Sequence, residues 1–165
     1  MYDIFSLPDF PFPPGFLWGS GAAGHQIEGN NTNSQYWRME EESKRKEPSG
    51  LACNSYVQWR DDHEMLSALG HQAYRMSIEW SRIEPARGCF SQEALDHYKE
   101  VVDDLKKRGI KVFVTLWHWT HPIWFEDLGG FSKRDNLVHF ERFVRLIAKE
   151  FAGRVDNWHV LNEFN

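Results

Sequence analysis

The chain has 165 residues, of which 41% are hydrophobic and 26% are charged, and its formal net charge is -5. A chain of this length can bury roughly 70% of its unfolded surface, so one domain with a core of its own is expected. The acidic balance argues against nucleic acid as a partner, because a phosphate backbone is bound by clustered Lys and Arg.

No feature of the sequence indicates a membrane or an export route. The stretch MYDIFSLPDFPFPPG has neither a basic n-region nor an apolar h-region, and no apolar run approaches the roughly 20 residues that span a bilayer. Cys53 and Cys89 have no C-x-x-C spacing, which argues against a disulfide framework and against a zinc knuckle. We therefore expect a cytoplasmic protein.

Strand and helix patterns alternate along the chain. Residues 1–15 hold most of the prolines and predict an extended arm. Four short apolar runs predict buried strands, at residues 16–20, 73–78, 111–117 and 157–162. Helical patterns lie between consecutive strands, at residues 55–69, 91–109 and 136–151.

The helix predicted over residues 91–109 has the clearest signals. Ser91 is a candidate N-cap, and Gly109 follows a Lys-Lys-Arg last turn. Its apolar residues recur at helical spacing: Leu95, Tyr98, Val102 and Leu105. In the last helix the corresponding apolar face is formed by Phe140, Phe143, Val144, Ile147 and Phe151.

The alternation of strands and helices predicts right-handed parallel crossovers, either in a doubly wound sheet or in a TIM barrel. The glycines of WGSGAAG do not form G-x-G-x-x-G and are followed by a polar loop, which argues against a nucleotide-binding sheet. Polar residues lie at the carboxyl ends of all four strands: Gln26, Glu28, Arg75, Glu79, His118, Trp119, Asn162 and Glu163. A TIM barrel builds its site from such strand ends. We predict an α/β fold of the (β/α)8 TIM-barrel type, here its first four strands with the intervening helices.

Some of these residues also have a purely structural explanation. Glu163 fits an exposed residue at a strand end, and Gln26 fits an amide that stabilises a loop. Arg75 within a strand fits a buried ion-pair partner of Glu79 or Glu28. The residues alone leave these alternatives open.

Three further patterns invite interpretation. His118 and His121 form H-x-x-H, but catalytic zinc takes three protein ligands and no third candidate is spaced nearby, so no metal is predicted. The run RMEEESKRKE over residues 38–47 predicts a solvated loop or helix face. The eight Trp residues suit a core or a flat ligand such as a carbohydrate. Packing is expected for Trp80, Trp124 and Trp158, and ligand contact for Trp119.

Four segments carry a specific family resemblance: FLWGSGAAGHQIEG, YRMSIEWSRIEP, TLWHWTHPIW and VLNEFN. Their order and spacing resemble glycoside hydrolase family 1, the β-glucosidase-like retaining glycosidases. The resemblance implies hydrolysis of β-O-glycosidic bonds, with a small-molecule β-glycoside as substrate and no metal or organic cofactor. It implies these roles: Gln26, His118 and Trp119 bind the sugar, Asn162 holds its 2-hydroxyl, Glu163 is the general acid/base, and Arg75 contacts the nucleophile.

The chemistry explains why such residues are needed. A retaining glycosidase uses two carboxyl groups about 5 to 5.5 Å apart, one as nucleophile and one as acid and then base. The Asn162 amide can strengthen its hydrogen bond to the 2-hydroxyl as charge develops, and Gln26 offers both a donor and an acceptor to vicinal hydroxyls. An arginine such as Arg75 favours the charged form of a neighbouring nucleophilic carboxylate.

Two residues depart from the family pattern. Thr120 stands where many members have Asp, which affects local loop contacts. Phe164 stands where the family usually has Pro, and a proline biases the preceding residue away from helical backbone. The orientation of the Glu163 side chain is therefore expected to be less tightly fixed than in the family.

A TIM barrel needs eight strands and typically about 250 residues, whereas this sequence supplies four strands. We expect residues 1–165 to form the N-terminal part of a single glycosidase barrel domain. The resemblance places the nucleophile in a Glu-Asn-Gly segment that this sequence lacks, so the isolated chain is expected to be inactive. Its partner would be the missing C-terminal half of the barrel. The alternatives are a noncatalytic sugar-binding or regulatory fragment, and a module that pairs with a separately encoded half. The kind of sugar stays open.

Overall fold

The computed structural model describes residues 11–43 and 47–163. Its centre is one sheet of four parallel strands: β1 Gly19–Gly21, β2 Ala73–Ser77, β3 Lys111–Trp117 and β4 Asn157–Leu161. The strands lie in the order β1-β2-β3-β4, with Ala73 opposite Lys111 and Phe113 opposite Asn157. A doubly wound sheet reverses its strand order at a switch point, and this one does not. The predicted fold is confirmed: the chain forms an open, four-stranded part of a TIM barrel.

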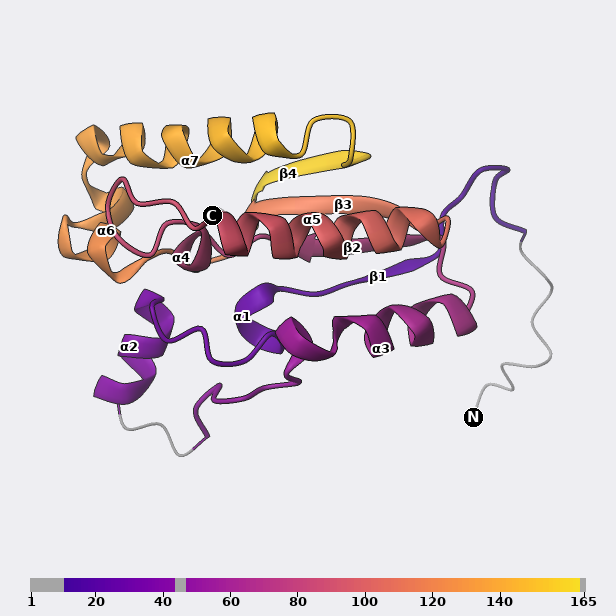
Figure 1. Cartoon of the computed structure of the whole chain (residues 1–165), viewed down its shortest axis with the longest axis horizontal. Helices are drawn as coiled ribbons and strands as arrows, with labels where there is room; N and C mark the ends of the chain where they lie inside the picture. Colours follow the sequence, from indigo (N-terminus) through magenta and orange to yellow (C-terminus); the bar gives the residue numbers. More distant parts are fainter. Residues whose placement is uncertain (1–10, 44–46, 164–165) are drawn as a thin grey trace, which may run out of the picture.

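Long helices connect the strands, and short ones gather where the strands end. The connecting helices run alongside the sheet: α3 Ser55–Ala68, α5 Gln92–Lys107 and α7 Leu137–Glu150 (Figure 1). At the carboxyl ends of the strands lie α1 Gly24–Ile27, α2 Gln35–Glu42, α4 Trp80–Ile83 and α6 Ile123–Asp127 (Figure 1). Two 3-10 turns, η2 Gly130–Ser132 and η3 Arg134–Asn136, precede α7. The loops that build a barrel site therefore meet at one end of the molecule.

Helix α5 forms as its sequence predicts. The Ser91 hydroxyl caps it by accepting a hydrogen bond from the Ala94 amide at 3.1 Å. Its predicted apolar face is buried, and Val102 and Leu105 are fully inaccessible to solvent. A cap satisfies one of the amides that a helix start leaves without an internal partner, and the apolar stripe fixes which side meets the sheet.

The core lies between the sheet and its connecting helices. Alternate residues of β3, among them Val112 and Val114, are fully buried on the side that faces the helices. Phe143 and Ile147 of α7 complete this core, together with Trp80 at the start of α4. Successive side chains of a strand point to opposite faces, so Phe113, Thr115 and Trp117 lie on the other face. There Thr115 is fully buried, and Phe113 and Trp117 are partly buried.

The first and last strands differ from the prediction that all four are buried. All residues of β1 and β4 are exposed, because these strands form the two edges of the sheet. Trp158 on β4 was expected to pack in the core, but it is 38% exposed and only part of its side chain is buried. The alternation of β-strands and helices could be predicted from the sequence, but which strands are edges depends on what covers them.

The segment before β1 also differs from the prediction. The strand expected from Phe16 begins at Gly19. Phe16 is exposed, and its ring lies 4.4 Å from that of Phe12 and 5.1 Å from that of Trp18, between centroids. The apolar run thus forms an aromatic cluster before it becomes a strand. Residues 1–10 of the predicted arm lie outside the described residues, and residues 11–15 are exposed and contain a turn.

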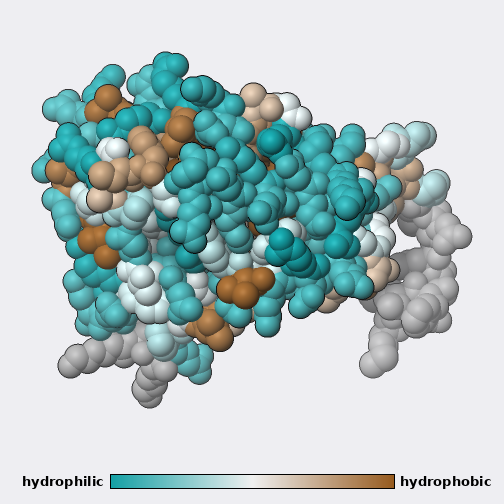
Figure 2. Space-filling view, in the orientation of Figure 1, coloured by the Kyte–Doolittle hydropathy of each residue, from teal (hydrophilic) through white to brown (hydrophobic). Residues whose placement is uncertain are grey.

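The face of the molecule seen over α5 and α3 is mostly hydrophilic, with only separate hydrophobic residues between the charged ones (Figure 2).

Cys53 and Cys89 are both exposed and are not joined in a disulfide. Among the described residues, no helix combines the length and the apolar character that crossing a membrane requires.

Candidate active site

The predicted site residues come from the carboxyl ends of all four strands. Gln26 lies on α1 after β1, Arg75 lies within β2, and His118 and Trp119 follow β3. Asn162 and Glu163 follow β4. Parallel strands end at the same edge of a sheet, so segments far apart in the sequence share one face.

A cavity of about 480 Å³ opens at this end of the sheet. Three of the predicted residues line it, Gln26, His118 and Trp119, together with Ala23, His25, Tyr36, Glu40, Glu47, Ser49 and Thr120. Its volume is in the range of small-molecule sites, and its walls combine aromatic rings with amide, imidazole and carboxylate groups. Such a mixture suits a ligand with apolar ring faces and hydroxyl edges.

Arg75 joins the residues that follow β3 and β4. Its Nε donates to Thr115 Oγ1 at 2.9 Å, and its guanidinium donates to Asn162 Oδ1 at 2.5 Å. The same guanidinium lies 3.5 Å from His118 Nδ1. The alternative of an ion pair with Glu79 or Glu28 is therefore wrong for the described structure, because the Arg75 side chain is turned toward Thr115 on the neighbouring strand.

The surroundings of His118 favour its neutral form. Burial, and then the positive charge of Arg75, lower the pKa of His118 from its ordinary value. Because the guanidinium can only donate, His118 Nδ1 is assigned as the acceptor and Nε2 as the protonated nitrogen. A neutral imidazole of this kind can donate its Nε2 hydrogen to a ligand hydroxyl.

Two residues of the site have left-handed backbone. Trp119 has a φ of 70° and Glu163 has a φ of 48°, and neither is a glycine. Such conformations are uncommon for large side chains and persist where the surrounding structure holds them. They turn the chain sharply just after β3 and β4.

A buried carboxylate, Glu79, accepts hydrogen bonds from the segments that follow β1 and β3 and from the end of β2. Its Oε2 accepts hydrogen bonds from Asn31 Nδ2 at 2.8 Å and from Thr120 Oγ1 at 2.6 Å. Its Oε1 accepts from Ser77 Oγ at 3.2 Å, and Ser77 Oγ accepts from the Gly24 amide at 2.7 Å. Glu79 is 2% exposed. One side chain thereby links the ends of β1, β2 and β3.

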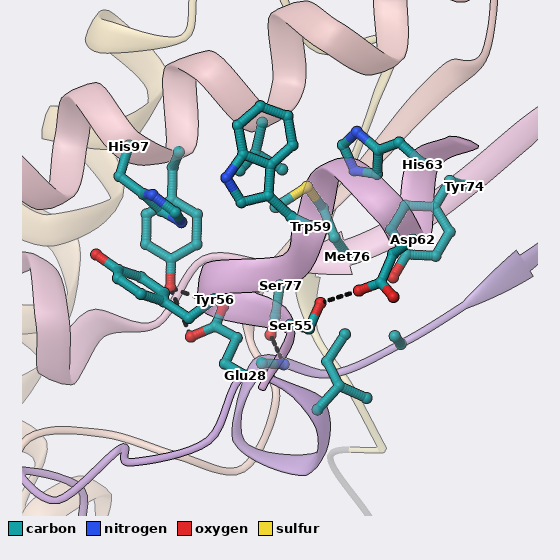
Figure 3. A pocket seen from close by; sticks show the side chains of 15 residues that line it. Glu28, Ser55, Tyr56, Trp59, Asp62, His63, Tyr74, Met76, Ser77 and His97 are labelled. Carbon is teal, nitrogen blue, oxygen red and sulfur yellow. Dashed lines mark hydrogen bonds between the residues drawn. The ribbon is translucent and has the colours of Figure 1, made fainter. Parts of the chain in front are cut away.

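A second buried carboxylate, Glu28, lies beside the first. Tyr98 donates to both Glu28 oxygens, at 2.8 and 3.0 Å, and Arg82 Nε donates to Oε2 at 2.7 Å. Burial, and then the charge of Glu79, raise the pKa of Glu28 to about 7. Figure 3 shows Glu28 and Ser77 on the wall of a cavity of about 30 Å³, which is too small for a sugar ring.

Gly24 is required by this pair of carboxylates. A Cβ at Gly24 would lie 2.7 Å from Glu79 Oε1 and 2.9 Å from Glu28 Oε1. Both contacts are shorter than carbon and oxygen atoms tolerate. The close approach brings the helix that carries Gln26 directly onto the buried network.

Comparison with known proteins identifies the family. The sequence model of glycosyl hydrolase family 1 matches residues 9–165. The chain belongs to glycosyl hydrolase family 1. It is 37% identical over 161 residues to β-glucosidase A of Thermotoga maritima, an alignment that covers 92% of this chain and 36% of that protein.

Solved structures agree with this membership of glycosyl hydrolase family 1. A β-glycosidase from Pyrococcus horikoshii superposes with a TM-score of 0.87 at 41% identity, over 92% of this chain and 36% of the other. A β-glucosidase from Thermotoga maritima in complex with castanospermine gives a TM-score of 0.87 at 36% identity, over 92% and 37%. The chain spans only about a third of the length of these relatives.

The departure from the family pattern at Thr120 has a structural reason. Its hydroxyl donates to the buried Glu79 carboxylate at 2.6 Å, and Thr120 itself is buried. An Asp at this position would place a second carboxylate against Glu79, whereas Thr supplies a hydrogen. The Thr120 hydroxyl therefore supplies one of the hydrogen bonds that the buried Glu79 carboxylate accepts. Phe164, the other departure, lies outside the described residues.

Replacing Thr120 by Val should lower the free energy of unfolding by about 1–3 kcal/mol, because a buried carboxylate loses a donor while the shape is kept. Urea unfolding followed by circular dichroism measures this change. Thr32→Val is the matched control, since Thr32 is exposed. Equal effects of the two substitutions would contradict the role assigned to the Thr120 hydroxyl.

The interpretation of residues 38–47 as a solvated segment was only partly right. Glu41 and Glu42 are exposed on α2, but Glu40 is 6% exposed and its Oε2 accepts from the Ser49 amide at 2.9 Å and from its hydroxyl at 2.6 Å. Residues 44–46 lie outside the described residues. Glu40 lines the cavity of this glycosyl hydrolase family 1 member, and within a run of charges nothing distinguished it.

The two histidines of H-x-x-H have separate partners. His121 Nε2 lies 2.8 Å from Glu126 Oε2, whereas His118 lies beside Arg75. Within residues 11–43 and 47–163, no three His, Cys, Asp or Glu side chains are grouped as a metal site would need. Trp80 is 1% exposed and Trp124 is partly buried against the core, as their predicted packing role requires.

Proposed function

We propose that this chain supplies the acid/base side of a retaining β-glycosidase site, with Glu163 as the general acid/base. One arrangement carries the proposal: the cavity lined by Gln26, His118 and Trp119, with Arg75 hydrogen-bonded to Asn162 beside Glu163. Membership of glycosyl hydrolase family 1 and the β-glucosidase relatives support β-O-glycosidic bonds as the target.

The proposed roles follow from the hydrogen-bonding groups. Asn162 Oδ1 accepts from Arg75, which assigns the donor Nδ2 to the 2-hydroxyl of the sugar. Gln26 is exposed at the cavity and can bridge neighbouring hydroxyls, and neutral His118 can donate from Nε2. The Trp119 indole offers its face to the sugar ring. These interactions would strengthen as charge develops at the reacting carbon.

We further propose that the nucleophile comes from outside residues 1–165. A retaining mechanism needs a second carboxylate about 5 to 5.5 Å from the acid/base. Glu28 and Glu79 are buried and engaged in the network at the strand ends, Glu28 with Tyr98 and Arg82 and Glu79 with Asn31 and Thr120. Glu40 is buried and lines the cavity, and its Oε2 accepts two hydrogen bonds from Ser49. Arg75 would contact the nucleophile and keep it ionised.

The same proposal makes residues 1–165 the N-terminal part of one barrel domain, completed by the strands that the relatives have in addition. The relatives' greater length and the uncovered edges of β1 and β4 support this. The substrate would be a small-molecule β-glycoside whose sugar and aglycone depend on the added loops. The cytoplasmic location stays a prediction.

The test is hydrolysis of a chromogenic aryl β-glucoside by the purified chain, alone and mixed with a chain that carries the remaining strands. We expect activity only in the mixture, and Glu163→Gln should lower it by at least about 100-fold, as loss of a general acid/base does. Glu100→Gln, an exposed residue of α5, is the matched control and should leave the rate unchanged.

Two other outcomes have clear meanings. Hydrolysis by the chain alone that Glu163→Gln removes would show that residues 1–165 contain their own nucleophile. Binding of castanospermine without hydrolysis in any mixture would favour the noncatalytic, sugar-binding alternative.

A further inference from the structure

The loop after β3 is held in an unfavourable conformation. Trp119 has a φ of 70°, in the left-handed region, and its side chain is large. A non-glycine residue in this region is strained, because its Cβ crowds the backbone. The conformation must therefore be maintained by contacts of the loop with the rest of the chain.

Gln35, the first residue of α2, makes three hydrogen bonds to this loop. Its side-chain Nε2 donates to the Trp119 carbonyl at 2.6 Å, and its Oε1 accepts from the His121 amide at 2.7 Å. Its own backbone amide donates to the His121 carbonyl at 3.0 Å. The side-chain amide thus spans residues 119–121 and pairs with one backbone acceptor and one backbone donor.

The chemistry of this contact is specific to an amide. Glutamine carries a donor and an acceptor at one end, whereas glutamate carries only acceptors and methionine carries neither strong group. The loop is also anchored a little further on, where the Ile123 amide donates to the Asn33 carbonyl at 3.0 Å. Removing the Gln35 side-chain amide should therefore loosen the backbone at Trp119 and His121. The Asn33 contact and the hydrogen bond from Thr120 to Glu79 would still hold the segment in place.

The contact made by Gln35 lies between two residues that line the cavity of about 480 Å³, Trp119 and Tyr36. Trp119 lines it directly, and its ring lies 5.0 Å from that of His118 between centroids. Tyr36, the residue after Gln35, lines it as well. A rotation of the Trp119 backbone would move its ring and disturb the imidazole beside it.

We propose that Gln35 is a positioning residue of the sugar site: its side-chain amide holds the Trp119 backbone in the left-handed conformation and fixes how His118 and Trp119 face the cavity. The effect of Gln35 on the loop is inferred from its hydrogen bonds to Trp119 and His121. The effect of Gln35 on sugar binding rests on the proposed function.

Three variants of the full chain test this proposal. Gln35→Met removes both side-chain hydrogen bonds, and Gln35→Glu keeps the acceptor for the His121 amide but loses the donor to Trp119. Gln58→Met, on the exposed side of α3, is the matched control. The readouts are hydrogen exchange of the His121 amide, the indole NMR signal of Trp119, and castanospermine affinity by calorimetry.

In Gln35→Met we expect about 10-fold faster His121 exchange, a shifted Trp119 signal and about 10-fold weaker castanospermine binding, since one hydrogen bond is worth about a factor of ten. In Gln35→Glu the His121 exchange should stay slow while the Trp119 signal shifts. Gln58→Met should change none of the three. A general loss of stability would speed His121 exchange as well as shift the Trp119 signal. It therefore cannot explain slow exchange together with a shifted signal in Gln35→Glu.

An unchanged Trp119 signal in both Gln35 variants would overturn the proposal. A shifted signal with unchanged castanospermine affinity would overturn the positioning of the sugar site while leaving the loop contact. If the unmodified chain does not bind castanospermine, the proposed sugar site of this chain fails, and the exchange and indole signals still decide whether Gln35 holds the loop.

Discussion

Replacing Trp80 by alanine is expected to lower the free energy of unfolding by about 3–5 kcal/mol, the range for a fully buried large aromatic side chain. Trp80 is 1% exposed and stacks on Phe143, with 5.2 Å between ring centroids and 19° between ring planes. Its Nε1 also donates to Glu84 Oε2 at 2.8 Å, and Glu84 is fully buried. The substitution would leave both a cavity and a buried carboxylate with one donor fewer.

Urea unfolding followed by circular dichroism gives this free energy. Trp158→Ala is the matched control, because it removes the same side chain from β4, where Trp158 is 38% exposed. We expect the control to cost about 1 kcal/mol, since only part of its apolar surface is buried. Similar losses for the two variants would show that Trp80 does not carry the packing between α4 and α7.

Glu28→Gln is expected to remove a large pH dependence of stability. Burial, and then the charge of Glu79, raise the pKa of Glu28 from 4.5 to about 7, although Arg82 and Tyr98 favour its charged form. The folded chain therefore holds the Glu28 proton more tightly than the unfolded chain does. This contribution to stability is fully present below about pH 4.5 and is lost as the pH rises through about 7, with a total on the order of 3 kcal/mol.

Glutamine does not titrate, so the variant should lack this decline. Free energies of unfolding at several pH values from about 4 to about 8 should show the variant gaining on the unmodified chain as the pH rises, by on the order of 3 kcal/mol in total. Glu64→Gln on the exposed side of α3 is the control and should give a curve parallel to that of the unmodified chain. A parallel curve for Glu28→Gln would refute the raised pKa.

The fold could be predicted from the sequence where local signals agreed with tertiary packing. Helix α5 had a capping serine and an apolar stripe, and both act in the structure as expected. Gly109 follows the helix with a φ of 78°, the left-handed conformation that favours glycine there. The strand predicted over residues 16–20 was wrong at its start, because an apolar aromatic run can also pack its rings on one another outside a strand. Here the rings of Phe12, Phe16 and Trp18 contact one another, and the strand begins only at Gly19.

The arrangement of the candidate site residues was predictable to the extent that strand ends determine it. A parallel sheet brings its carboxyl ends together, so Arg75, His118 and Asn162 could be expected on one face, and the structure joins them by hydrogen bonds. Gln35 could not be found in this way. Its partners are backbone groups far along the chain, and no pattern of side chains records which backbone groups a loop leaves available.

The strand order also affects how the chain can fold during synthesis. Each strand pairs with the strand that precedes it in the sequence, Gly19 with Ala73, Ala73 with Lys111 and Phe113 with Asn157. Domains begin to fold while the ribosome is still adding residues, and loop closure becomes more costly as the loop lengthens. A new strand of this sheet can dock as soon as the strand itself and the helix before it have left the ribosome, because its partner strand is already in place. Folding can thus keep pace with translation, one strand and one helix at a time.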